Sequence, residues 1–221
     1  MFVVLQVTAA QQEAIEQSTR KQAGSAVWHM ERKWRITASR FGDIAFATER
    51  RNREKLCQSL FSSVTIWNKA IFHGQQYEAV ARKLFEQLFD IQIRSAGLFI
   101  SVEKPWLAAS PDGIIDDDCL IEIKCPYRGR NSMITPSAEF PFLTYNGDEV
   151  VLKQHSKYFC QVQGQLYITG RRICKFFVYT FVDMFLQEIA IDVEYCKQSL
   201  IPKLDSFYCT YFRRHIARSL E

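Results

Sequence analysis

The sequence of 221 residues lacks several features that would place it in a specialised class of protein. Its seven cysteines include no Cys-x-x-Cys pair and are odd in number, which argues against a zinc site and against a disulfide framework. No apolar run approaches the roughly 18 residues of a membrane-spanning helix, and the first residues lack the basic start of a signal peptide. We therefore expect reduced thiols in an intracellular protein without a membrane segment.

The chain also lacks a strong excess of one charge. Its 28 Lys and Arg against 24 Asp and Glu give a net charge of +4, which permits a nucleic-acid partner without indicating one. Hydrophobic residues make up 48% and charged residues 24%, values typical of a globular protein with a substantial core. Repeats and low-complexity tracts are absent. We expect one domain over residues 1–221.

The apolar spacing divides this domain into a helical part up to about residue 70, a core at about 71–193 and a closing helix at about 194–217. The other helices are expected at 9–22, 25–34, 52–61, 75–89 and 155–169, with a short one after Thr37. Strands are expected at 91–100, 105–109, 119–125, 173–181 and 185–192, with a polar loop at 128–150. This order predicts an α/β (α+β) fold with a central mixed β-sheet flanked by helices.

The stretch "CLIEIKC" at 119–125 carries opposite charges on one face of a predicted strand. Side chains alternate along a strand, so Glu122 and Lys124 share a face and lie about 7 Å apart along the chain. Upstream, "SPDG" is typical of a turn, and it brings Asp112 beside the same strand. A plain surface hairpin with an exposed Glu–Lys pair is the common alternative.

Two neighbouring carboxylates repel each other, and Mg²⁺ removes that repulsion because it prefers hard oxygen ligands. The predicted metal site therefore uses Asp112, Glu122 and the backbone carbonyl of Ile123, with Lys124 beside the scissile phosphate. The run "DDD" at 116–118 is interpreted instead as the solvated tip of a hairpin.

Five segments in order resemble the phage-lambda exonuclease and YqaJ-like viral recombinase (alkaline exonuclease) family of PD-(D/E)xK nucleases. They are "WHMERKWRITAS" (28–39), "GQQYEAVARKLFE" (74–86), "ASPDG" (109–113), "IEIKCPY" (121–127) with Arg130, and "YFCQVQGQLYITG" (158–170). The resemblance implies a restriction-endonuclease-like core and Mg²⁺-dependent digestion of double-stranded DNA from an end, 5′ to 3′, leaving 3′ single strands. Mn²⁺ is an expected substitute for Mg²⁺.

The resemblance also implies roles for residues that spacing alone leaves undecided. Glu78, on its own pattern a solvated helix residue, takes the position of a helix carboxylate that completes the metal site. Gln163, with Gln161 a weaker candidate, takes the position of a glutamine that borders the catalytic residues. A 5′-phosphate pocket falls on Arg32, Ser39, Ser110 and Arg130, and Arg35 is a weaker candidate for a DNA backbone contact.

The alternatives are a structure-specific or restriction-like endonuclease on the same core, and a non-catalytic DNA-binding or assembly protein with a relic site. An iron–sulfur nuclease is disfavoured because the cysteines are not clustered. The family further implies DNA recombination, a single-strand annealing protein as partner, and a viral source with a location in the host cytoplasm or nucleus. Its members include ring-shaped trimers and monomers, so the oligomeric state stays open.

Overall fold

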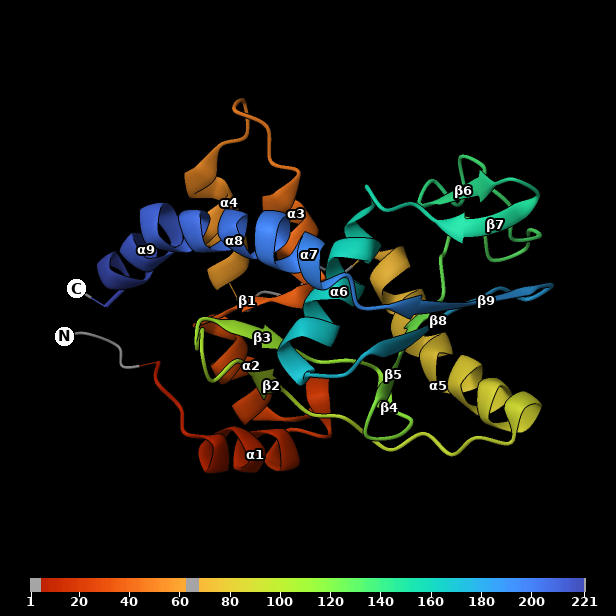
Figure 1. The fold of residues 1–221 in the computed structure, drawn as a ribbon, viewed down its shortest axis with the longest axis horizontal. Coiled ribbons are helices and arrows are strands. Elements are labelled where there is room, and N and C mark those ends of the chain that lie inside the picture. The colour runs from red at the N-terminus through yellow and green to blue at the C-terminus, as the bar shows by residue number, and fades with distance from the viewer. Residues whose placement is uncertain (1–4, 63–67, 221) are drawn as a thin grey trace.

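A computed structural model describes residues 5–62 and 68–220, which form a mixed sheet with helices on both faces (Figure 1). The strands are β1 (Ile36–Thr37), β2 (Phe99–Ile100), β3 (Leu107–Ala109), β4 (Gly113–Ile114), β5 (Cys119–Lys124), β6 (Leu143–Asn146), β7 (Glu149–Leu152), β8 (Ile173–Tyr179) and β9 (Met184–Ala190). The helices are α1 (Ala9–Ser18), α2 (Ala26–Lys33), α3 (Phe41–Ala45), α4 (Arg53–Phe61), α5 (Lys69–Phe89), α6 (Lys157–Thr169), α7 (Val193–Tyr195), α8 (Ile201–Phe207) and α9 (Arg213–Arg218). Short 3₁₀ turns lie at Gln22–Gly24 and Ala38–Arg40.

The central sheet has the strand order β4-β5-β8-β9. β5 and β8 run parallel, whereas β4 pairs with β5 and β9 pairs with β8 in the antiparallel sense. A smaller sheet of order β1-β3-β2 places β1 parallel to β3. The prediction of a mixed sheet between helices is therefore confirmed.

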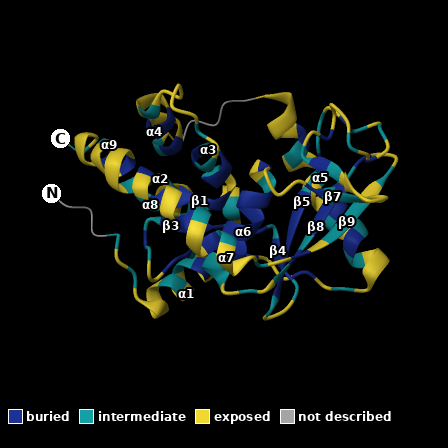
Figure 2. Ribbon diagram, turned by 45° about the horizontal axis from the view of Figure 1, so that its top comes forward, coloured by how far each residue is buried: buried dark blue, intermediate teal, exposed yellow. Residues whose placement is uncertain are grey.

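The two long helices of the core cover opposite faces of the central sheet. On one face, Ile121 and Ile123 of β5 pack with Ala81 and Phe85 of α5. On the other face, Leu120 packs in the cluster that contains residues 162 and 166 of α6. Side-chain alternation then turns Glu122 and Lys124 toward α6 as well. The strand is buried along most of its length, as the dark colouring of the sheet in Figure 2 shows.

The structure corrects two predicted segments. Of the strand predicted at 91–100, only Phe99–Ile100 is a strand, together with a single bridge from Arg94 to Ile114. The predicted loop at 128–150 contains β6 and begins β7, which form a hairpin. Its tight connection places Gly147 at φ +60°, a conformation that glycine adopts without strain.

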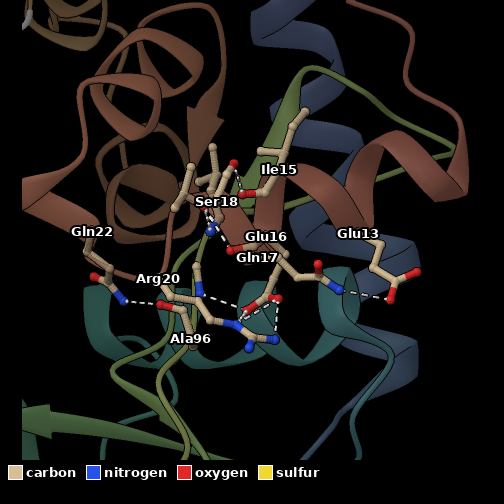
Figure 3. Close-up of polar contacts among 11 residues, drawn as sticks. Glu13, Ile15, Glu16, Gln17, Ser18, Arg20, Gln22 and Ala96 are labelled. Carbon is tan, nitrogen blue, oxygen red and sulfur yellow. Dashed lines mark hydrogen bonds and ion pairs between the residues drawn. The ribbon is translucent and has the colours of Figure 1, made fainter.

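The N-terminal helix α1 is fastened to the chain that leads into β2 (Figure 3). Glu16 accepts a hydrogen bond from the backbone N–H of Gly97 at 2.9 Å and is paired with Arg20. Beyond the helix, the Gln22 side chain donates to the carbonyl of Ala96 at 3.0 Å and to the carbonyl of Pro111 at 2.8 Å. The 3₁₀ turn after α1 therefore supports the turn that carries Asp112.

The closing helical segment runs from α7 to α9 with π-helical turns at Cys196–Leu200 and Tyr208–Phe212, close to the prediction of 194–217. It packs Leu204 and Phe212 against a core that includes Phe41 of α3. Within residues 5–62 and 68–220, the structure has no helix that is long and apolar enough to cross a membrane.

Candidate active site

Glu122 and Lys124 lie side by side on β5, as strand alternation predicts. The Glu122 residue is only 1% exposed, and its Oε1 forms an ion pair with the Lys124 ammonium. Burial opposes the charge of this ammonium, but the negative charges of Glu122 and Asp112 raise the pKa of Lys124. The lysine is therefore a fixed positive charge at neutral pH.

Two glutamines of α6 complete the contacts of Glu122. The Gln161 amide donates to Oε1 of Glu122 at 2.5 Å, and its own oxygen accepts from Lys124 at 3.2 Å. The Gln165 amide donates to Oε2 of Glu122 at 2.6 Å. These residues are one helical turn apart, so both point from α6 toward β5.

Gln163, which the resemblance placed beside the catalytic residues, faces away from them. Its amide donates to the carbonyl of Ala190 at 2.9 Å, and its oxygen accepts from the N–H of Asp192 at 2.7 Å. Two residues along a helix correspond to a rotation of about 200°, which puts Gln163 on the side opposite Gln161. The structure therefore corrects this assignment and replaces Gln163 with Gln161 and Gln165.

Asp112 reaches β5 from the turn between β3 and β4. Its Oδ2 accepts a hydrogen bond from the backbone N–H of Ile123 at 2.6 Å, next to Glu122. Arg82 of α5 donates to the Asp112 carbonyl at 3.4 Å and also bonds the carbonyl of Ile93. Arg82 was not among the predicted site residues, although its spacing of four residues from Glu78 places both on one side of α5.

Glu78 interacts with this group from the exposed side of α5. Desolvation and the charge of Glu122 raise the pKa of Glu78, while Lys124 and Arg82 oppose the shift. Desolvation and the charges of Glu122 and Glu78 raise the pKa of Asp112 well above its ordinary value. The charges of these three carboxylates and of Lys124 thus influence one another, with an excess of negative charge.

The chemistry of this donor set fits a divalent cation. Three carboxylates and one ammonium sum to a formal charge of −2, or −1 with the Arg82 guanidinium that bonds Asp112. Carboxylate and carbonyl oxygens are the ligands that Mg²⁺ prefers. In the part of the chain that the structure describes, no group of three or more His, Cys, Asp and Glu side chains forms a ready cage for a metal. Mg²⁺ is usually held by one or two carboxylates and completes its shell with water and substrate.

A second polar group lies past the ends of the parallel strands β1 and β3. Ser110 accepts hydrogen bonds from the Trp28 indole at 3.0 Å and from Arg32 at 3.5 Å, and the Arg32 guanidinium stacks over the Trp28 ring at 4.0 Å. Burial and the charge of Arg40 lower the pKa of Arg32 to about 10, so it stays charged at neutral pH. No described carboxylate pairs with Arg32. Trp28 and Arg32 are four residues apart on α2, a helical pairing that the sequence analysis did not use.

The other predicted phosphate ligands lie in different parts of the structure. Ser39 is exposed, and its hydroxyl oxygen lies 3.3 Å from that of Thr37. Thr37 is on β1, which pairs with β3, the strand that ends just before Ser110. Arg130 instead stacks over Tyr127 at 4.3 Å and donates to its carbonyl at 2.8 Å, and no described contact joins it to Arg32. Arg35 is 4% exposed, pairs with Glu31 and donates to backbone carbonyls, so the structure corrects its assignment as a DNA contact.

The acidic run at 116–118 lies at a turn, as interpreted. Asp116 accepts from the backbone N–H of Asp118 at 2.8 Å, and Asp118 pairs with Arg172. The Asp117 side chain is fully exposed. These carboxylates do not extend the cluster around Glu122.

Comparison with known proteins decides the family. The model of the YqaJ-like viral recombinase domain matches residues 27–172. The chain belongs to this family. The uncharacterized protein R354 of Acanthamoeba polyphaga mimivirus is 30% identical over 120 residues, which are 49% of this chain and 20% of that protein. The chain thus spans only about a fifth of the length of this curated relative.

Solved structures share the fold of this YqaJ-like chain. The alkaline exonuclease LHK-Exo from Laribacter hongkongensis has a TM-score of 0.63 at 23% identity, covering 87% of this chain and 96% of its own. LHK-Exo in complex with dAMP is 25% identical with a TM-score of 0.62, covering 87% and 95%. The shutoff and exonuclease protein of the Kaposi's sarcoma-associated herpesvirus has a TM-score of 0.55 at 13% identity, covering 92% and 73%. The predicted family and the nuclease-like fold are therefore confirmed.

Proposed function

We propose that this YqaJ-like chain is a Mg²⁺-dependent exonuclease that hydrolyses double-stranded DNA from a 5′-phosphorylated end, 5′ to 3′. One observation carries the proposal: Asp112 accepts a hydrogen bond from the N–H of Ile123, directly beside the buried Glu122–Lys124 pair of β5. Unrelieved negative charge in such a place needs a cation. The family and the exonuclease fold support the same conclusion.

The proposed role of each side chain follows from its charge and its position. Asp112, Glu122, Glu78 and the Ile123 carbonyl would hold one or two ions, and Mn²⁺ has the same ligand preferences. When bound, Mg²⁺ would lower the pKa of the attacking water and offset charge on the leaving oxygen. Lys124, held by Glu122 and Gln161, offers a fixed positive charge to the scissile phosphate as negative charge develops on it.

The 5′-phosphate would bind at Arg32 and Ser110, with Ser39 nearby. Arg32 offers a buried guanidinium that no described carboxylate neutralises, and a terminal phosphate supplies the charge and acceptors that it lacks. Trp28 fixes its position by stacking. Arg130, on a separate aromatic cluster with Tyr127, is proposed as a backbone contact rather than as part of this pocket.

The test uses a linear duplex labelled at one end, with and without a 5′-phosphate, in Mg²⁺. We expect release of nucleotides from the phosphorylated 5′ strand, a slower reaction without the phosphate, and none in EDTA. A closed circular plasmid serves as the control, because an end-dependent enzyme spares it. Nicking of the plasmid would support the endonuclease alternative, and no cleavage of either substrate would support a non-catalytic DNA-binding role.

A further inference from the structure

Gln165 is a buried residue whose side chain makes one polar contact with the residues that the structure describes. It is 1% exposed, and its amide nitrogen donates to Oε2 of Glu122 at 2.6 Å. Its own oxygen, Oε1, is buried and has no hydrogen-bond donor among the described residues. A buried acceptor without a partner costs about 1–3 kcal/mol, so the side chain needs a reason to be polar.

That reason lies in how the two oxygens of Glu122 are held. Oε1 accepts from Lys124 and from Gln161, whereas Oε2 accepts only from Gln165 among the described residues. Without Gln165, Oε2 would be buried without a hydrogen-bond donor. The carboxylate would also be free to rotate about its last side-chain bond. With Gln165, the amides of residues 161 and 165 fix the plane of the carboxylate from two consecutive turns of α6.

The neutrality of the amide matters at this place. A lysine or arginine would also hold Oε2, but its charge would offset the negative charge that attracts a cation. An amide donates a hydrogen bond and adds no charge. Gln165 therefore holds the carboxylate without weakening its attraction for a divalent ion.

We propose that Gln165 is a positioning residue, which acts through Glu122 to orient this carboxylate toward a divalent cation. The inference rests on the proposed function, in which Glu122 is a metal ligand. Partners that orient metal ligands typically contribute 10–100-fold to metal affinity or activity. In this role, Gln165 acts only through its hydrogen bond to Glu122.

The test replaces Gln165 with Met, which fills similar volume and lacks the donor. Binding of Mn²⁺ to the DNA-free protein is measured by electron paramagnetic resonance, and nucleotide release is measured against Mg²⁺ concentration. We expect Q165M to bind Mn²⁺ at least about tenfold more weakly and to need correspondingly more Mg²⁺ for half-maximal activity. The Gln165→Asn variant, one methylene too short to reach Oε2, should behave in the same direction and covers a failure of Q165M to fold.

The matched control is Gln163→Met, on the opposite side of the same helix. Gln163 is equally buried and bonds the backbone at Ala190 and Asp192, so its loss should lower the melting temperature and leave Mn²⁺ affinity unchanged. Wild-type Mn²⁺ affinity in folded Gln165 variants would overturn the inference while the proposed function stands. A wild-type protein that binds no Mn²⁺ and releases no nucleotides would overturn the proposed function, and this role with it.

Discussion

Replacing Lys124 with Met tests the centre of the proposed reaction, because Met keeps most of the side-chain length and removes the charge. The ammonium pairs with Glu122, lies 3.2 Å from the Gln161 oxygen and sits over the Tyr158 ring at 4.7 Å. Without it, the pKa values of Asp112 and Glu78 rise further, because the charge of Lys124 lowers both. The expected loss is about 10²–10³-fold in the rate of the cleavage step, the effect of removing one group that stabilises transition-state charge.

The same substitution should also destabilise the fold. The Lys124 and Glu122 side chains are 17% and 2% exposed, so the broken pair leaves a buried carboxylate. We expect a loss of about 3 kcal/mol in the free energy of unfolding, near the lower end for such pairs because Gln161 and Gln165 still donate to Glu122. Added Mg²⁺ should recover part of this loss in the variant.

The assay is single-turnover cleavage of an end-labelled duplex at saturating enzyme, with DNA affinity followed separately by fluorescence anisotropy. Lys175→Met is the control, since Lys175 pairs with the exposed Glu188 on the neighbouring strands and should change cleavage little. Cleavage by K124M within about tenfold of the wild-type rate, at equal DNA binding, would refute the role of the ammonium.

Three further substitutions test other parts of the structure. Arg32→Met should reduce the preference for 5′-phosphorylated over unphosphorylated ends about tenfold or more, as measured by the ratio of cleavage rates, because a charge-assisted hydrogen bond is lost. Hydrogen bonds and charges of Lys157 and Arg40 outweigh burial and lower the pKa of Asp43. Asp43→Asn should therefore cost about 1 kcal/mol in urea unfolding at pH 7, a difference that disappears as the pH falls below the ordinary value of 3.8. Gly97→Ala would place Cβ 1.9 Å from the Glu16 carbonyl oxygen and should cost about 1–3 kcal/mol, whereas Gly74→Ala, with nothing within 4 Å, should not destabilise.

The strand carrying Glu122 could be predicted because alternation is a local property. Two charges among Ile, Leu and Cys fix a face once the segment is a strand. Prediction of the α6 residues that contact Glu122 requires the helical register as well as the residue type. At about 100° per residue, positions 161 and 165 share a side and position 163 does not, so the signal was present in the sequence. The resemblance favoured Gln163 instead, but the helical register places this residue on the other side of α6.

Other features depended on contacts that a pattern does not contain. Arg35 looks like a basic residue available for DNA, yet its guanidinium is used by Glu31 and the Pro105 carbonyl, 70 residues away in sequence. Arg130 likewise stacks on Tyr127 of its own loop, and no described contact joins it to Arg32. The hairpin at 143–152 did carry a local signal, because "NGD" between "LTY" and "EVVL" is typical of a tight turn.

The two hydrogen bonds of Gln22 have a consequence for how the molecule could lose activity. They tie a residue near the start of the chain to the carbonyls of Ala96 and Pro111, immediately before Asp112. Peeling of this terminal segment, or its removal by a protease, would release the Asp112 turn while the β5 strand stays in its sheet. Inactivation should then precede global unfolding, with the earliest amide exchange at residues 9–24.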